Sequence, residues 1–279
     1  MTGPGFLKNS GITVFAFLAG LLLFSGTCKN LLMQAEADCA RVALDEEEYF
    51  IYVPRAYNRA KKPQQFPLLV AVHGSGLYKG KELTGGPMCE GYRRLAEYYS
   101  VILVCPTLHG DFPIAENGSG KIVERIIRQV TRKYSVHPKR ISLYGFSAGA
   151  EFVERLAFME PEMFDAVVCV DGGSDFKRTV PKNRKLPRFL FMIGAEDLPR
   201  RVRQSAEMAG IIRKAGGLAG FELIPNLGHE ESEQIKRRAF GFGTEDIAQT
   251  RWANRGSAHK EEEEAVSPGN LRGKLEFVL

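Results

Sequence analysis

The chain has 279 residues, which is enough for one large α/β domain or two small ones. Hydrophobic residues make up 44% and charged residues 25%, and this balance excludes a wholly disordered chain, a collagen-like repeat and a polytopic membrane protein. The net charge of +5 is small, and the basic residues form no long stripe with interleaved aromatics, so we expect no nucleic-acid partner.

A long apolar stretch stands near the beginning of the chain. The thirteen residues from Ile12 to Phe24 carry no charge, and Lys8 precedes them. This length suits the apolar region of a secretory signal peptide, and with its flanks it approaches a membrane-spanning helix. We predict that residues 1–28 are a signal peptide or a membrane anchor, and that the protein is secreted or anchored on the extracytoplasmic side.

Several interpretations of this segment stay open. The small residues 25–27 offer a cleavage site, and residues 35–37 offer a second one. Cys28 suggests lipid attachment, although the residues before it fit the required pattern poorly. A buried N-terminal core helix is a further alternative, and the lack of a polar face argues against it. We predict that residues 29–45 are a linker.

Short apolar runs alternate with amphipathic stretches through the middle of the chain. Several runs are apolar at nearly every position, as in parallel strands that are buried on both faces. We predict strands at residues 48–53, 67–72, 101–105, 140–144, 164–170, 188–193 and 220–224. We predict helices at residues 92–99, 122–134, 150–158, 202–214 and 231–240.

This alternation predicts one α/β domain over residues 46–240, with a mostly parallel central sheet and helices on both faces. Folds of this kind hold their ligands at the carboxyl ends of the strands. Residues 241–279 contain the run Glu261–Glu264 and few core-forming residues, so we predict a charged C-terminal extension.

The pentapeptide Gly145-Phe146-Ser147-Ala148-Gly149 has the form G-x-S-x-G and stands between a predicted strand and a predicted helix. In that context the motif predicts a tight turn that exposes a nucleophilic serine. The two glycines let the flanking strand and helix approach each other closely. We therefore predict that Ser147 is a nucleophile.

A serine needs a base and an orienting acid to become a strong nucleophile. In this architecture the acid and then the histidine follow the serine along the chain. Asp197 and His229 each stand just past the end of a predicted strand, in the required order. We predict a catalytic triad of Ser147, Asp197 and His229, with Glu196 and Asp171 as alternatives for the acid.

An oxyanion hole requires two backbone donors that face the developing negative charge. We predict that the amide of Ala148 supplies one donor and that the turn after the strand at 67–72, at Ser75, supplies the other. His73 in that turn is interpreted as stabilising it, whereas His109 is expected near the rim of the site, in substrate contact or in plain loop structure. The walls of the acyl pocket are expected from loops 76–91, 107–120 and 172–187.

The five cysteines form no C-x-x-C pair and no metal-ligand spacing, and no nucleotide-binding loop is present. We therefore predict no metal and no cofactor. Cys105 and Cys169 lie inside apolar runs and are expected to be buried. Cys39 and Cys89 lie outside the predicted core strands, and the sequence leaves a disulfide between them open.

Several of these features together resemble the α/β-hydrolase superfamily. They are His73-Gly74, the pentapeptide at 145–149, Asp197 and His229. The stretch from Tyr134 to Gly149 is similar to the polyhydroxybutyrate depolymerase and feruloyl or acetylxylan esterase branch, which usually carries aspartate where His137 stands. The resemblance covers residues 46–240. It implies a secreted carboxylesterase that acts on aryl, acetyl or polyester bonds without a cofactor.

We therefore predict a serine carboxylic-ester hydrolase that works through an acyl-enzyme intermediate, with a small-molecule or polymer-linked ester as its substrate. A serine peptidase or acyltransferase with the same triad is one alternative. A non-catalytic envelope binding protein is another, but binding alone gives no reason to keep a serine, an acid and a histidine in order. The sequence leaves the natural substrate and the oligomeric state open.

Overall fold

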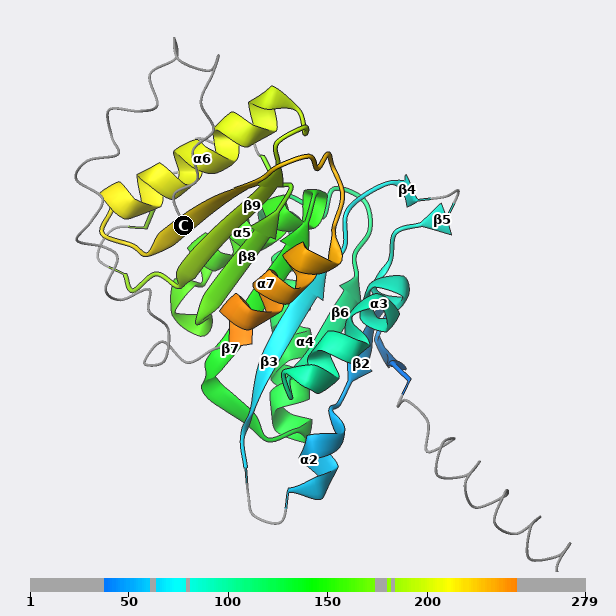
Figure 1. Cartoon of the computed structure of the whole chain (residues 1–279). Helices are drawn as coiled ribbons and strands as arrows, with labels where there is room; N and C mark the ends of the chain where they lie inside the picture. The colour runs from blue at the N-terminus through cyan, green and yellow to red at the C-terminus, as the bar shows by residue number, and fades with distance from the viewer. Residues whose placement is uncertain (1–37, 61–63, 79–80, 174–179, 182–183, 245–279) are drawn as a thin grey trace, which may run out of the picture.

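The computed structural model of the chain describes residues 38–60, 64–78, 81–173, 180–181 and 184–244 (Figure 1). The predicted signal or anchor segment, residues 1–28, lies outside the described residues, as does the C-terminal extension from residue 245 onward. Within the described ranges, no helix combines the length and the apolar character that crossing a membrane requires.

An eight-stranded sheet forms the centre of the fold, in the order β1-β2-β6-β3-β7-β8-β9-β10. The six strands from β6 to β10 in this order are parallel, whereas β2 pairs antiparallel with both β6 and β1. The strands are β1 (Ala40–Leu44), β2 (Glu47–Tyr52), β3 (Phe66–Val72), β6 (Ile102–Thr107), β7 (Val136–Phe146), β8 (Ala166–Val170), β9 (Arg188–Gly194) and β10 (Ala219–Ile224). A separate hairpin joins β4 (Leu77–Tyr78) to β5 (Lys81–Glu82).

Helices cover both faces of this sheet (Figure 1). Helices α3 and α7 pack on one face, and α4, α5 and α6 pack on the other. The helices are α2 (Arg55–Arg59), α3 (Gly85–Tyr98), α4 (Ser119–Lys133), α5 (Ala148–Met159), α6 (Pro199–Lys214) and α7 (Glu233–Thr244), with short 3-10 turns η1 (Ala115–Asn117) and η2 (Pro161–Met163). The predicted mostly parallel sheet with helices on both faces is confirmed.

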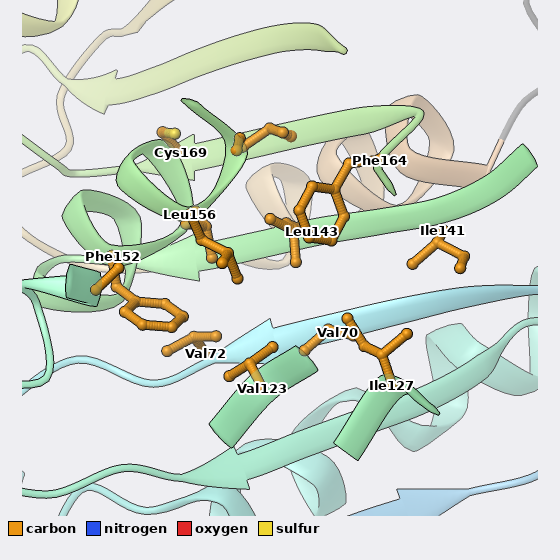
Figure 2. Packing of buried hydrophobic residues seen from close by; sticks show 14 of the residues in the cluster. Val70, Val72, Val123, Ile127, Ile141, Leu143, Phe152, Leu156, Phe164 and Cys169 are labelled. Carbon is orange, nitrogen blue, oxygen red and sulfur yellow. The ribbon is translucent and has the colours of Figure 1, made fainter. Parts of the chain in front are cut away.

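Strand β3 is buried at every position, because helices cover both faces of the sheet at this strand. Val70 and Val72 pack on one face of the sheet with Val123 of α4 and Phe152 of α5 (Figure 2). The alternate residues, such as Leu69, belong to a second buried cluster on the other face, under α3 and α7. Because successive side chains of a strand point to opposite faces, a strand covered on both sides needs apolar residues throughout.

The folded unit extends beyond the predicted limits of 46 and 240. Strand β1 lies in the segment that we predicted as a linker, and it pairs along its whole length with β2. Helix α7 continues to Thr244. An edge strand such as β1 is largely open to solvent and needs no continuous apolar run, so its sequence carries little strand pattern.

Helix α3 also begins earlier than predicted, at Gly85 instead of Tyr92. Its first turn contains Gly85, Gly86 and Pro87, a composition typical of a loop. A Cβ atom on Gly85 would lie 2.3 Å from the carbonyl oxygen of Cys105, so glycine is what lets the helix approach β6. The expectation that the whole stretch 76–91 forms a pocket loop is therefore wrong from residue 85 onward.

A disulfide bond joins Cys39, next to β1, to Cys89 in α3. It closes a loop across 50 positions of the chain and fastens the edge of the sheet to a helix that covers it. The sequence left a Cys39–Cys89 disulfide open, and the structure contains it. Cys105 and Cys169 are buried free thiols, as expected.

Candidate active site

The turn between β7 and α5 holds Ser147 in a conformation that residues other than glycine rarely adopt, with φ 54° and ψ −117°. Hydrogen bonds hold the turn on both sides. The Ser147 amide donates to the carbonyl oxygen of Val170 on β8 at 2.9 Å, and the Ser147 carbonyl accepts from the amide of Ala150 at 2.9 Å. This strained strand-to-helix turn is the geometry that lifts a serine side chain out of the sheet.

Two glycines make this turn sterically feasible. A Cβ atom on Gly145 would lie 2.2 Å from the carbonyl oxygen of Gly149, and a Cβ atom on Gly149 would lie 2.2 Å from that of Val72. Both distances are far below van der Waals contact. The physical reason for the G-x-S-x-G spacing is therefore the close approach of β7, α5 and the end of β3.

The three residues predicted as a triad lie together at the carboxyl edge of the sheet. The Ser147 hydroxyl lies 2.9 Å from Nε2 of His229, and Nδ1 of His229 lies 2.8 Å from Oδ2 of Asp197. Nη1 of Arg201 also lies 3.0 Å from Nδ1, but its hydrogen bond to Oδ1 of Asp197 gives it an acceptor of its own. With Nδ1 donating to the Asp197 carboxylate, which only accepts, Nε2 is free to accept from the serine. This tautomer is the one that a general base for Ser147 requires.

Asp197 is enclosed, with 1% of its side chain exposed, whereas 33% of the His229 side chain is exposed. Besides the histidine, the carboxylate accepts from the amide of Leu198 at 2.6 Å and from Nη1 of Arg201 at 3.3 Å. These donors stabilise the charged form of a buried carboxylate. Sequence reasoning missed Arg201, although its spacing of four residues from Asp197 at the start of α6 is a signal that could have found it.

Neither alternative acid makes the contact that Asp197 makes. Glu196 is exposed, and its backbone amide donates to the carbonyl of Leu227. Asp171, just past β8, is buried, and its Oδ1 accepts from the amide of Gly194 at 3.0 Å. Burial raises the pKa of Asp171 to about 6. We therefore favour Asp197 as the partner of the histidine.

Asp171, Asp197 and His229 each offer a ligand atom within 4.8 Å of the others, a spacing that a metal ion also accepts. Both ring nitrogens of His229 are already engaged, one by Asp197 and one by Ser147. The contacts of the histidine therefore match proton transfer better than metal coordination.

The loop that carries His229 fits closely against the end of β9. A Cβ atom on Gly194 would lie 2.3 Å from the carbonyl oxygens of Leu227 and Gly228, so only glycine permits this approach. The imidazole ring also packs against the ring of Phe146, with centroids 5.2 Å apart. Sequence reasoning missed Gly194, because the clash appears only when the end of β9 and the histidine loop are packed together.

The turn after β3 lies against the nucleophile. A Cβ atom on Gly74 would lie 3.3 Å from Cβ of Ser147, and Ser75 follows in the same turn and is exposed. Ala148 is the first residue of α5. The assignment of the amides of Ser75 and Ala148 to an oxyanion hole stays a prediction that this arrangement favours.

His73 has the structural role that we expected of it. Its Nε2 accepts from the amide of Leu108 at 3.0 Å, and its Nδ1 donates to the carbonyl of Gly74 at 2.7 Å. Burial lowers the pKa of His73, so the ring is neutral and ties the turn after β3 to the segment after β6. His109 is exposed, with Nδ1 3.8 Å from a carboxylate oxygen of Glu82.

Solved structures with the same fold exist for several esterases. An S-formylglutathione hydrolase from Staphylococcus aureus superposes with a TM-score of 0.60 at 14% identity, covering 76% of this chain and 99% of its own. An acetyl xylan esterase from Aspergillus awamori gives 0.55 at 16% identity, with 74% and 100% covered. A ferulic acid esterase from Anaeromyces mucronatus gives 0.58 at 14% identity, with 75% and 90% covered.

The chain has the α/β-hydrolase fold. No family model matches the sequence, and no curated protein does. Identities this low establish the shared α/β-hydrolase fold and leave the activity to be argued from the site.

Proposed function

We propose that this protein is a serine carboxylic-ester hydrolase in which Ser147 is the nucleophile, His229 the general base and Asp197 the orienting acid. The observation that carries the proposal is the unbroken hydrogen-bond chain from Ser147 through His229 to Asp197, with contacts of 2.9 and 2.8 Å. A structural serine in a turn has no need of a histidine in the correct tautomer, held by a buried carboxylate.

In the first half of the reaction, Oγ of Ser147 attacks the carbonyl carbon of an ester while its proton passes to Nε2 of His229. The resulting tetrahedral oxyanion is stabilised by the amide of Ala148 and by the turn at Ser75. Collapse of the intermediate breaks the ester C–O bond. The proton on His229 moves to the departing alcohol, and the acyl group stays on Ser147.

In the second half, a water molecule attacks the acyl-enzyme and gives its proton to His229. The carboxylic acid leaves, and Ser147 recovers its proton. Asp197 stabilises the imidazolium in both halves without accepting the proton. The partial exposure of His229 and the half-buried position of Ser147 leave the reacting atoms accessible from solvent.

The substrate class follows from the same site and from its structural neighbours. A triad of this kind acts on acyl groups, and the neighbours include esterases named for acetyl xylan and ferulic acid. We propose a small-molecule or polymer-linked ester as the substrate. No step of this mechanism uses a cofactor.

We further propose that the protein acts outside the cytoplasm. The disulfide between Cys39 and Cys89 supports this location, because structural disulfides form and persist in oxidising compartments. The apolar segment Ile12–Phe24 would direct the chain there as a cleaved signal or as an anchor on the membrane. Intact mass of the protein isolated from its native source distinguishes a cleaved chain from a full-length one.

Hydrolysis of p-nitrophenyl acetate by the wild type and by Ser147→Ala tests the activity. We expect turnover by the wild type and only the background rate of ester hydrolysis by the variant. Undiminished hydrolysis by Ser147→Ala would exclude Ser147 as the nucleophile. Parallel assays with a peptide substrate and with an acceptor alcohol separate an esterase from a peptidase or an acyltransferase.

A further inference from the structure

Glu231, outside the proposed triad, carries a buried carboxyl group that two tyrosine hydroxyls contact. Its Oε1 accepts hydrogen bonds from the hydroxyl groups of Tyr92 and Tyr144, whose oxygens lie 3.1 Å from each other. Both tyrosines are almost completely buried. Burial raises the pKa of Glu231, whereas the two hydroxyl donors lower it. The proposed mechanism gives this cluster no part.

The three members of the cluster come from three separate elements. Tyr92 lies on α3, Tyr144 lies on β7 three residues before Ser147, and Glu231 lies two residues after His229. The Glu231 side chain therefore links the strand that carries the nucleophile to the loop that carries the base. Buried tyrosine hydroxyls need a hydrogen-bond partner, and here one carboxylate oxygen serves both.

The histidine loop has a different attachment on its other side. Upstream of His229, backbone hydrogen bonds hold it to the segment after β9, from the amide of Ala195 to Ile224 and from the amide of Glu196 to Leu227, both at 2.8 Å. Downstream of His229, the backbone amide of Glu230 faces the carboxyl group of Asp171, and the side chain of Glu231 accepts from Tyr92 and Tyr144 in the core. Two residues of chain span at most about 7 Å, so fixing Glu231 restricts the backbone of His229 closely.

We propose that Glu231 is a positioning residue that holds His229 at hydrogen-bond distance from Ser147 by anchoring the histidine loop to Tyr92 and Tyr144. This inference rests on the proposed triad. The anchor does not touch the reacting atoms, and it acts through the 2.9 Å contact between His229 and Ser147. Displacement of a catalytic group by about 1 Å costs on the order of 10²-fold in rate.

The packing around the cluster supports a rigid anchor. The ring of Tyr92 lies edge-on to the ring of Tyr144, with centroids 5.3 Å apart, and edge-on to the ring of Phe240 of α7 at 5.6 Å. The ammonium group of Lys236 lies 5.5 Å from the centre of the Tyr92 ring. Because the tyrosine rings are held in place, their hydroxyl groups are fixed donors for Glu231.

The test uses kcat and KM for p-nitrophenyl acetate on the full chain, together with the rate at which a fluorophosphonate labels Ser147. Glu231→Leu removes the acceptor, and we expect kcat and the labelling rate to fall by about ten- to hundredfold while KM stays within about twofold. Glu231→Gln keeps an oxygen acceptor for both tyrosines and is expected to retain kcat within about threefold. Glu230→Leu, the same change at the exposed neighbouring position, is the matched control with wild-type kinetics.

Circular dichroism and thermal unfolding establish that each variant is folded. If Glu231→Leu fails to fold, kcat of Tyr144→Phe tests the anchor instead, because this variant removes one hydroxyl and leaves the ring packing intact. A kcat at least about threefold below the wild type supports the anchor, and wild-type kcat overturns it. Wild-type kcat in a folded Glu231→Leu likewise overturns it.

The failure of this inference and the failure of the triad give different results. If the wild type neither hydrolyses the ester nor reacts with the fluorophosphonate, the proposed function is wrong, whatever the Glu231 variants do. If the wild type reacts at Ser147 and folded Glu231→Leu reacts equally fast, the triad stands and the anchoring role of Glu231 is wrong.

Discussion

Asp197 and Glu154 are both buried carboxyl groups, and they differ in what surrounds them. Asp197, at the carboxyl edge of the sheet, accepts from Leu198, Arg201 and His229. Glu154, on α5, is 5% exposed, and its Oε1 has no hydrogen-bond partner in the described structure. Both residues are about equally buried, at 6% and 5% exposure, and they differ in the hydrogen-bond donors that face the carboxyl group.

The surroundings of Glu154 fit a neutral carboxyl group. Burial, with a further contribution from the charge of Glu151, raises the pKa of Glu154 to about 8. The group borders a cavity of about 10 Å³ that Cys169, Gln204 and Met208 also line, close to the room that one water molecule occupies. Asp197 thus has three donors at the edge of the sheet, whereas Glu154 on α5 lies in surroundings that favour a protonated carboxyl group.

The largest expected effect is at the paired carboxylate. Asp197→Asn keeps the shape of the side chain but favours the wrong tautomer of His229, so we expect kcat to fall on the order of 10⁴-fold. Steady-state hydrolysis of p-nitrophenyl acetate measures this fall in kcat. Glu196→Gln, one residue earlier and exposed, is the matched control with wild-type kcat. If the loss occurs in Glu196→Gln instead, the acid of the triad is assigned one residue too late.

A smaller effect, on stability instead of rate, is expected at Glu154. The folded-state pKa of Glu154 lies above the ordinary value of 4.5, so its stabilising contribution is complete below about pH 4.5 and is lost as the pH rises toward 8. The full loss amounts to roughly 5 kcal/mol. The amide in Glu154→Gln cannot ionise, so this variant should not show that pH-dependent loss of stability.

Urea unfolding of wild type and Glu154→Gln at pH 5 and at pH 8.5 measures this effect. The variant should lose less free energy of unfolding between the two pH values than the wild type does, because all other titrating groups are shared. Equal pH dependence in the two proteins would show that Glu154 is charged, or has a partner, in the folded state.

Asp171 has fewer hydrogen-bond donors than Asp197, and its expected effect on stability is smaller than that of Glu154. One of its oxygens accepts from Gly194, the other has no partner in the described structure, and burial raises its pKa to about 6. Its contribution to stability is present below about pH 3.8 and is lost as the pH rises to 6, by about 3 kcal/mol in total. Asp171→Asn should remove this dependence.

Activity measurements on Asp171→Asn also sharpen the assignment of the acid. Asparagine still offers an oxygen to the amide of Gly194, so we expect kcat to fall by less than about tenfold. A loss as large as that of Asp197→Asn would mean that Asp171, and not Asp197, orients the histidine.

The sequence predicted the sheet and the proposed triad because their patterns are local. Ser147 is set by a pentapeptide between a strand and a helix, and Asp197 and His229 follow strands whose carboxyl ends meet at one edge. Strand β1 was missed, since an edge strand has no fully apolar run. The start of α3 was missed because Gly85 has a loop-like composition but is required by the approach to β6.

The contacts of Glu231 could not be predicted in the same way. Its partner Tyr92 lies 139 positions away in the chain, and no spacing rule connects a glutamate after one strand to a tyrosine in an early helix. The role of Gly194 is similarly visible only once β9 and the histidine loop are packed together. Positions that support the site through long-range packing therefore need the structure.

Covalent labelling by a fluorophosphonate tests the central claim most directly, because it requires an activated serine and no knowledge of the substrate. Oγ of an activated Ser147 bonds to phosphorus, fluoride departs, and His229 takes the proton. Peptide mapping should find one adduct, on Ser147, that is absent from Ser147→Ala. No adduct on the folded wild type, or an adduct that persists in Ser147→Ala, would contradict the account.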